Sequence, residues 1–487
     1  MAGGSQVIEA GWPPGLIGGS GISAQFQRFT SPLGFYVRTW LGFQHAQTAF
    51  RNRRYHWRVY SEPLILGMPD TLLDSLPLFV PTRDLEVAKA KAIVSSFTDK
   101  VRTFSDFGQV SVELFEGGIP YLVNEFWTSG QRLSHSLHEI SYRACFKAQL
   151  PEFFIERLTK PGDEIYDPFM GRGTTPVQAA LMGRKPMGND INPLSLLLTR
   201  PRLTPPTLAQ VERRLDTLDW YATEPADPDL LAFYSPATLD HVSALRRWLI
   251  ERAPLGSTPD PVDDWIRMVA MNRLTGHSPG FFSVYTLPPN QAISAQAQRK
   301  INEARSQSPP DRDVKKIILK KTKSLLSDGG MAKHPKGILT TAPAHSTPCI
   351  PTASVQLVVT SPPFLDIVQY AEDNWLRSWF AGIDVSSVHI AHHRTEAAWQ
   401  AMVHDVLAEL ARVVRSGGHI AFEVGEVRNG KVLLERLVWE AAANLPFERL
   451  FVMVNQQEFT KTANCWGVSN NAKGTNTNRI VVLRRDE

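Results

Sequence analysis

The sequence lacks the features of several common classes of protein. Its three cysteines, Cys145, Cys349 and Cys465, are widely separated and form no CxxC pair, which indicates a reducing compartment and no structural zinc. No run of about twenty apolar residues is present to span a bilayer. The N-terminus lacks the basic-then-apolar pattern of a signal peptide. We therefore expect a cytoplasmic protein with no metal and no membrane contact.

An excess of charge of one sign is also missing. Lysine and arginine together number 52, aspartate and glutamate 48, and the formal net charge is +4. This balance does not by itself demand a nucleic-acid partner, so local basic stretches must carry that argument. At 487 residues the chain is too long for one compact core, and we expect two or three structural units.

The sequence does contain a strand, a glycine-rich turn, a helix and a second strand, in the order of one βαβ unit. A short strand ends at Tyr166, the turn is Asp167–Thr175, and Pro176–Met182 has a helical pattern. The following strand ends at Asp190. This order and length are typical of a unit that binds a nucleotide-like cofactor beyond the ends of its strands.

The glycine-rich turn fits such a cofactor better than a triphosphate. Gly171 and Gly173 lack Cβ atoms, so the backbone could approach the cofactor, and the helix start offers unpaired N–H groups. Asp190 would accept hydrogen bonds from ribose hydroxyls. No GxxxxGK(S/T) pattern accompanies the turn, which argues against a nucleotide triphosphatase. A lone GxG is equally compatible with an ordinary tight turn, so the flanking residues decide the interpretation.

A second informative segment follows the apolar run Val355–Thr360, which is typical of a central strand buried on both faces. The strand leads into Ser361-Pro362-Pro363-Phe364, beside the cofactor turn if both end at the same edge of a parallel sheet. The two prolines stiffen this corner and withhold N–H donors. Ser361 Oγ and the Pro362 carbonyl would then accept the two N–H bonds of an exocyclic amine. Phe364 would stack on a base that has left its duplex.

Three further stretches also lead to predictions. Glu139–Leu158 has a helical stripe of apolar residues. The aromatic and basic run Arg51–Arg58 is either a nucleic-acid contact or part of a packing module. A basic helical stretch is either a face that follows phosphates or a solvated face, and its residues are Lys315, Lys316, Lys320, Lys321 and Lys323.

The pairing of the two motifs, over about Asn124 to Leu483, resembles the amino-methyltransferase family of DNA-modifying enzymes, in the branch whose corner reads Ser-Pro-Pro-aromatic. The resemblance implies S-adenosylmethionine as cofactor and double-stranded DNA with a flipped target base as substrate. It leaves open a cognate restriction endonuclease encoded separately. The cofactor residues of the family carry over to Asp167, Pro168, Phe169, Gly171, Gly173, Thr174 and Asp190. The catalytic corner carries over to Ser361, Pro362, Pro363 and Phe364.

The chain departs from this family after the third strand. Where the family often has Gly-Asp to reach the cofactor adenine, this sequence has Ala342-Pro343-Ala344-His345, which leaves the adenine contact unassigned.

The resemblance implies a doubly wound, mostly parallel Rossmann-like α/β sheet with a helical insertion, and we expect an N-terminal accessory module outside the resemblance. We expect the module at residues 1–123, with DNA contact left open as for Arg51–Arg58, and the catalytic domain at 124–200 and 337–487. The inserted target-recognition region would be 201–336.

The predicted function is site-specific methyl transfer to the N4 amine of cytosine in DNA. Three alternatives stay open at this point: an adenine-N6 DNA methyltransferase, an RNA base methyltransferase, and a catalytically silent nucleic-acid-binding subunit.

Overall fold

The computed structural model describes residues 96–128, 134–142, 145–221, 227–286, 292–331, 337–365, 373–388, 393–428, 431–456 and 477–486. The chain divides into two compact units, Met1–Pro81 and Thr82–Glu487, and all described residues belong to the second unit. The basic run Arg51–Arg58 and most of the predicted accessory module therefore lie outside the described residues.

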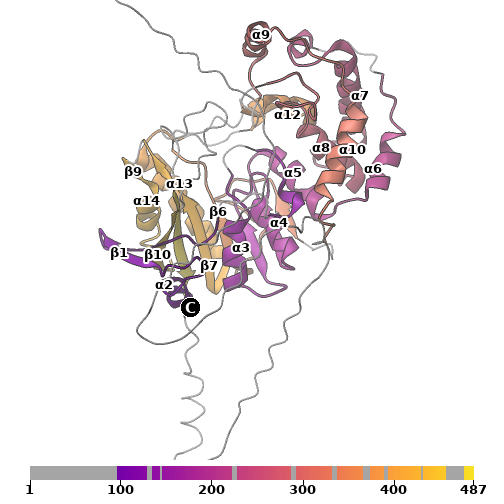
Figure 1. Ribbon diagram of the computed structural model, residues 1–487. Coiled ribbons are helices and arrows are strands. Elements are labelled where there is room, and N and C mark those ends of the chain that lie inside the picture. The colour runs from indigo at the N-terminus through magenta and orange to yellow at the C-terminus, as the bar shows by residue number, and fades with distance from the viewer. Residues whose placement is uncertain are drawn as a thin grey trace, which may run out of the picture. The chain divides into compact units, whose positions relative to one another are not determined.

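The second unit is built on a large mixed sheet whose order, within the described residues, is β1-β2-β10-β11-β7-β6-β3-β4-β5 (Figure 1). The strands are β1 (Val112–Glu116), β2 (Ile119–Asn124), β3 (Glu164–Asp167), β4 (Lys185–Asn189), β5 (Ile338–Thr340), β6 (Val355–Thr360), β7 (Val414–Val424), β10 (Phe447–Gln456) and β11 (Thr477–Arg485). A separate two-stranded sheet pairs β8 (Glu426–Val427) with β9 (Val432–Leu433).

The central part of the sheet is parallel, which confirms the predicted α/β class. Strands β5, β4, β3, β6 and β7 pair in parallel, and β11 is antiparallel to both β7 and β10. Beyond β10 the sheet continues through β2, which is parallel to β10, to β1 at the edge. The boundary predicted between residues 123 and 124 thus falls inside β2, within this sheet.

Helices cover both faces of the sheet, as a doubly wound fold requires. On one face lie α2 (Phe97–Arg102), α3 (Gln149–Leu158) and α4 (Thr174–Leu181), where Phe153 and Phe154 pack against the strand residues Ile165 and Leu357. On the other face lie α13 (Glu396–Val413) and α14 (Leu434–Ala441). Trp399 of α13 is buried in the core between these helices and the sheet. Strands buried on both faces explain the continuous apolar run of β6.

The predicted insertion is helical. It contains α6 (Leu208–Leu215), α7 (Pro236–Arg252), α8 (Pro261–Met271), α9 (Ala295–Ala304) and α10 (Val314–Leu325), and it follows α5 (Pro193–Leu203). Helices α7 and α8 each begin with proline after a capping side chain, Ser235 and Asp260, a favourable helix start. The later helix α12 (Trp375–Ala381) buries Leu376 and Phe380 in the same core.

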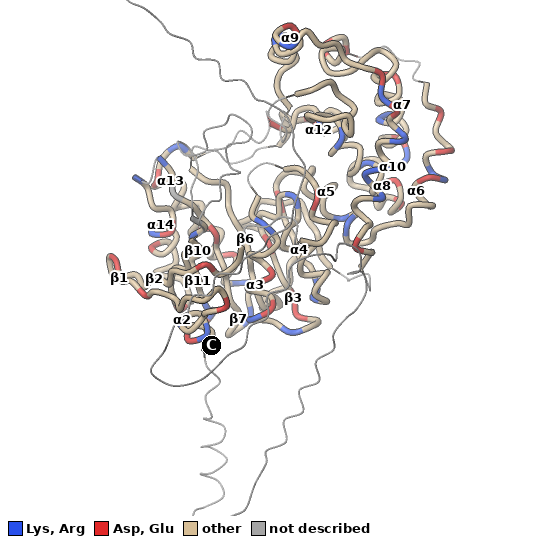
Figure 2. Tube along the Cα trace, in the orientation of Figure 1, with Lys and Arg blue, Asp and Glu red and all other residues tan. Residues whose placement is uncertain are grey.

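Charges of both signs are spread over the helices of the insertion (Figure 2). Two short 3-10 turns, at Pro228–Ala232 and Val385–Ser387, connect helices in this part of the chain. Among the helices that the structure describes, none is both long and apolar enough to cross a membrane.

The helix predicted over Glu139–Leu158 is shorter than expected, because α3 begins only at Gln149. The preceding residues 134–142, which we call the strap, contain a single 3-10 turn at Ser136–His138. Leu137, Ile140 and Tyr142 of the strap pack into the core shared with the insertion. Apolar spacing alone could not distinguish this packing from a helical stripe.

Candidate active site

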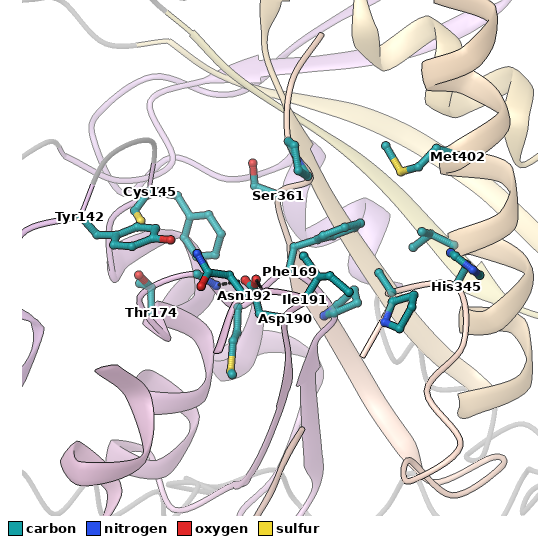
Figure 3. Close-up of a pocket in the computed structure, with 18 residues that line it drawn as sticks. Tyr142, Cys145, Phe169, Thr174, Asp190, Ile191, Asn192, His345, Ser361 and Met402 are labelled. Carbon is teal, nitrogen blue, oxygen red and sulfur yellow. Dashed lines mark hydrogen bonds between the residues drawn. The ribbon is translucent and has the colours of Figure 1, made fainter. Parts of the chain in front are cut away.

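A cavity of about 400 Å³ opens where β3, β4, β5 and β6 end, which is within the usual size of small-molecule sites (Figure 3). Its walls come from segments that are far apart in the sequence. They are Tyr142, Cys145, Phe146, Pro168, Phe169, Met170, Gly171, Thr174, Asp190, Ile191, Asn192, Pro343, Ala344, His345, Ser361, Pro363, Met402 and Val406. The glycine-rich turn and the proline corner therefore face one common space.

The carboxylate of Asp190 holds the glycine-rich turn in place. Its Oδ2 accepts from the Gly171 amide at 2.9 Å, and its Oδ1 accepts from the Asn192 amide at 2.9 Å. Asn192 in turn caps α5 by accepting from the Leu194 amide at 3.0 Å. Burial raises the pKa of Asp190, and the two amides oppose that rise. The strand tip, the turn and the start of α5 thus form one fixed unit.

Asp167 ties the turn to the proline corner. Its side chain is fully buried, and its Oδ1 accepts from the Thr360 hydroxyl at 2.6 Å and from the Phe169 amide at 3.0 Å. Burial raises the pKa of this carboxyl to about 7. Because Thr360 directly precedes Ser361, this contact fixes the distance between the two motifs.

The two glycines of the turn are required for different reasons. Gly173 has φ +77°, and a Cβ there would lie 2.2 Å from Thr199 Oγ1 of α5, so any side chain would force the helices apart. Gly171 has φ +49° and lines the cavity, and a Cβ there would face Tyr142 and Cys145 at 3.8 and 3.9 Å. Only Gly171 is therefore in a position to meet a ligand.

The corner presents Ser361 to the cavity and is braced from behind. The Pro363 carbonyl accepts from the indole of Trp399 on α13 at 2.8 Å, and Phe364 packs on the hydrophobic core beside α13. The Ser361 hydroxyl hydrogen-bonds the buried carboxyl of Glu423 at the end of β7. Burial raises the pKa of Glu423 to about 6.

Glu423 has a second polar partner on the neighbouring strand. Asn478 Nδ2 of β11 donates to Glu423 Oε1 at 2.9 Å. Asn478 and Ser361 therefore satisfy a carboxylate that would otherwise be costly to bury.

The predicted site residues divide into two groups. Seven of them line the cavity: Pro168, Phe169, Gly171, Thr174, Asp190, Ser361 and Pro363. The other four, Asp167, Gly173, Pro362 and Phe364, are not among the lining residues. The contacts of Asp167, Gly173 and Phe364 instead fix the turn, α4 and the corner.

Sequence reasoning missed several residues of the site. Tyr142, Cys145 and Phe146 precede α3 and carry no recognisable motif, and Met402 and Val406 are simply apolar positions of α13. Ala344 and His345, which stand where the family resemblance fails, form part of the wall. Glu423 did leave a signal, because it interrupts the apolar run of β7.

Within the described part of the chain, no group of three or more His, Cys, Asp or Glu side chains is arranged to hold a metal ion.

Comparison with known proteins gives matches to part of this chain. Residues 118–197 match the family model described as DNA methylase. The type II methyltransferase M.MvaI of Kocuria varians is 35% identical over 100 residues, which are 20% of this chain and 22% of that protein. M.MjaII of Methanocaldococcus jannaschii is 44% identical over 69 residues, 14% of this chain and 13% of that protein. The chain thus matches less than a quarter of the length of these relatives.

Among solved structures, TrmN from Thermus thermophilus aligns with 70% of this chain and 50% of its own, at 11% identity and a TM-score of 0.28.

Proposed function

We propose that this chain, which through residues 118–197 belongs to the DNA methylase family of N6 and N4 amino-methyltransferases, methylates the exocyclic N4 amine of cytosine in DNA. One observation carries the proposal. The turn held by Asp190 and the corner that presents Ser361 line the same cavity, so a cofactor on the first would face a base on the second.

The cavity walls suit S-adenosylmethionine, which supplies an electrophilic methyl group on a sulfonium. Phe169, Ile191 and Met402 offer apolar surface to a flat adenine, and Pro343–His345 adds wall at the position where the family resemblance fails. Asp190 Oδ1 and Oδ2 each accept one backbone amide. A carboxylate oxygen has a further lone pair, so Asp190 still has room for ribose hydroxyls.

Ser361 would orient the amine of the target base. Such an amine is a poor nucleophile because its lone pair is delocalised into the ring. The Ser361 hydroxyl donates to Glu423, which leaves its oxygen lone pairs free to accept an amine hydrogen, and the Pro362 carbonyl would accept the other. Two acceptors draw the nitrogen toward tetrahedral geometry and direct its lone pair at the methyl group.

The amine must lose one proton when it gains the methyl group. Glu423 is the carboxylate placed to take that proton up through Ser361, and its raised pKa of about 6 makes it a better base than a solvent-exposed glutamate. Asn478 holds the carboxylate in the required orientation.

The neutral Ser361 favours cytosine as the base. It accepts from the amine without bringing a carboxylate against the acceptor atoms of the ring, since Glu423 is buried behind it. The cavity lies beyond the carboxyl ends of β3, β4, β5 and β6, and a target base would leave its duplex to reach Ser361 there. DNA with a flipped cytosine is therefore the proposed substrate.

Nucleoside mass spectrometry of plasmid DNA and of total RNA, each incubated with the protein and isotope-labelled S-adenosylmethionine, tests this function. We expect labelled N4-methylcytosine in the DNA only. Ser361→Ala should reduce turnover by roughly two to three orders of magnitude, the usual effect of losing one oriented catalytic hydrogen bond.

Other products would correct the proposal. N6-methyladenine would overturn the base assignment and keep the mechanism, and product in RNA alone would overturn the substrate. Cofactor binding without transfer to any nucleic acid would indicate a silent binding subunit.

A further inference from the structure

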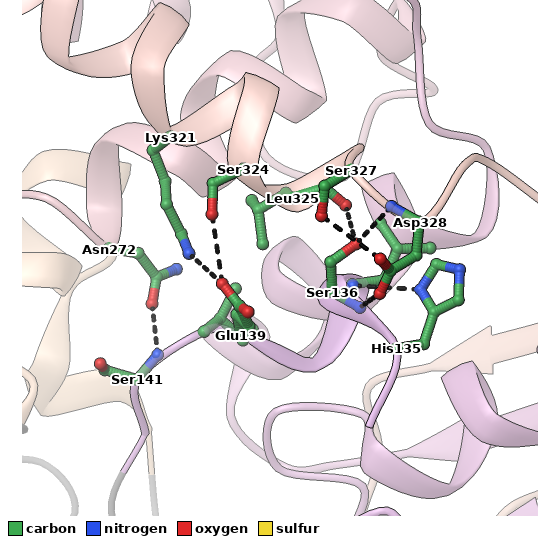
Figure 4. Close-up of polar contacts among 12 residues, drawn as sticks. His135, Ser136, Glu139, Ser141, Asn272, Lys321, Ser324, Leu325, Ser327 and Asp328 are labelled. Atoms are coloured by element: carbon green, nitrogen blue, oxygen red, sulfur yellow. Dashed lines mark hydrogen bonds and ion pairs between the residues drawn. The ribbon is translucent and has the colours of Figure 1, made fainter. Parts of the chain in front are cut away.

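Basic side chains from three helices of the insertion side meet around the strap, residues 134–142. Lys321 of α10 pairs with Glu139 at 3.2 Å, and Arg377 of α12 donates to the Ser141 carbonyl at 3.0 Å. Asn272, at the end of α8, accepts from the Ser141 amide at 3.1 Å (Figure 4), and Arg273 is the next residue of the chain.

Carboxylates match only part of this positive charge. Lys321 has Glu139, but the hydrogen bonds of Arg377 go to neutral oxygens, those of Ser141 and Asn374. The Arg273 guanidinium stacks on the Phe281 ring with its centre 4.0 Å from the centroid. Its Nε is buried without a hydrogen-bond partner. Burial is the largest influence on the pKa of Arg377 and lowers it, whereas the nearby charge of Asp373 raises it.

The two arginines are close enough to repel each other. Burial, and then the charge of Arg377, lower the pKa of Arg273 to about 10, which leaves it cationic at neutral pH. The pKa of Lys321 is lowered mainly by burial and next by the charge of Arg273. Both arginines are only partly exposed, so solvent screens this repulsion incompletely. An anion between the two guanidinium groups would relieve it.

The pair lies one side chain outside the proposed active site. Tyr142, which follows Ser141, lines the cavity, and the Arg377 guanidinium is 5.9 Å from the centroid of its ring. Neither arginine lines the cavity itself. An anion bound there would sit beside the cavity and not within it.

We propose that Arg273 and Arg377 bind a backbone phosphate of the DNA strand that delivers the target nucleotide. This inference rests on the proposed function, because a base inserted in the cavity leaves its flanking phosphates outside. Guanidinium groups present several donors to phosphate oxygens in a planar array. The phosphate would be held against the strap, which also contacts Asn272 at the end of α8 and Lys321 of α10.

Salt-dependent binding of the full-length protein to sheared plasmid DNA tests the inference without turnover. Arg273→Gln should weaken binding roughly tenfold at low salt, the usual effect of losing a charged hydrogen bond. It should also lower the slope of log affinity against log salt by about one, because one phosphate contact releases about one counterion. Arg305→Gln is the matched control, since Arg305 also stacks on a ring, that of Tyr285 at 3.9 Å, away from the strap.

Three further readouts separate phosphate binding from a structural role. S-adenosylmethionine affinity should be unchanged in Arg273→Gln, and the thermal midpoint should not fall, because the lost charge was repelled. Inorganic phosphate should raise the thermal midpoint of the wild type more than that of the variant. Arg273→Lys, which retains charge without the planar fork, should retain the salt slope and lose part of the affinity.

Equal slopes in Arg273→Gln and Arg305→Gln would overturn the inference, and so would lost cofactor affinity with unchanged DNA binding. If the wild type methylates DNA while these slopes are equal, only the phosphate site fails. If the wild type binds DNA with the predicted slope change and methylates no nucleic acid, the proposed function fails and the phosphate site stands.

Discussion

Single carboxylates decide the chemistry and much of the rigidity of this site. In the proposed function Asp190 has two roles, because it holds the Gly171 amide and has lone pairs available for a ribose. Asp167 and Glu423 are buried, hydrogen-bonded and raised in pKa, to about 7 and about 6. Perturbed carboxylates of this kind gather at functional sites, since burial changes their affinity for protons.

Asp190→Ala should weaken S-adenosylmethionine binding by about 1–3 kcal/mol, because the ribose hydroxyls lose a charged acceptor and the turn loses its clamp. Asp190→Asn is the matched control, because it retains one acceptor oxygen and the shape of the side chain. The S-adenosylmethionine affinity of Asp190→Asn should lie between those of the wild type and Asp190→Ala. Calorimetric affinities that are equal in all three proteins would remove Asp190 from the cofactor site.

Turnover and stability should respond to pH in opposite directions through Glu423. Its folded pKa, about 6, lies above the ordinary value of 4.5, so the folded state binds the proton more tightly than the unfolded state. The resulting stabilisation is complete below the unfolded pKa and is lost as pH rises through about 6. Turnover should instead fall as pH drops through the same range, because protonated Glu423 cannot accept a proton.

Glu423→Gln isolates this effect from other titrating groups. Urea unfolding from pH 4 to pH 8 should show the wild type losing on the order of 2 kcal/mol more than the variant, as the linkage relation gives for this shift. A variant with the wild-type pH profiles of both unfolding and turnover would contradict the role of Glu423.

At the scale of elements, the lysines of the basic stretch predicted from the sequence, which forms α10, fall into two groups. Lys315 pairs with Asp216 and Lys321 with Glu139, so these two lysines join the helix to its neighbours. Lys316 and Lys320 are exposed. The alternatives of a phosphate-following face and a solvated face therefore concern the exposed lysines alone.

The double change Lys316→Gln and Lys320→Gln should lower the salt slope of DNA binding by about two, one counterion for each lost phosphate contact. Lys300→Gln, on the exposed side of α9, serves as the control for nonspecific loss of charge. Thermal stability should stay unchanged. A slope equal to that of the wild type, measured by fluorescence anisotropy, would leave these lysines a solvated face.

At the scale of the whole molecule, the described residues that line the cavity all lie between Tyr142 and Val406, inside the unit Thr82–Glu487. A chain that begins at Thr82 should therefore bind S-adenosylmethionine as tightly as the full chain does. Comparing its DNA affinity with that of the full chain would show what the first residues add. Loss of cofactor binding on truncation would mean that the first unit supports the site.

Local sequence was sufficient for the parts of this protein that local physics fixes. The strand β6 was predictable because burial on both faces requires a continuous apolar run, and the turn before α4 because only glycine adopts φ +77° without strain. The approach of Asp190 and Ser361 to one cavity followed from the rule that ligands bind beyond the ends of parallel strands.

Tertiary structure alone decided the rest. The strap has the apolar spacing of a helix but packs as an irregular segment, because its side chains enter a core built mainly from helices of the insertion, which sequence spacing does not record. Glu423 meets Ser361, and the charge of Arg377 acts on Arg273, only because strands and helices distant in sequence are brought together. The sequence by itself determined which residues could hold a cofactor and an amine, because those motifs are short and contiguous. The fold determined which charged side chains lie beside these motifs, because charged groups from distant parts of the sequence come together only when separate elements pack.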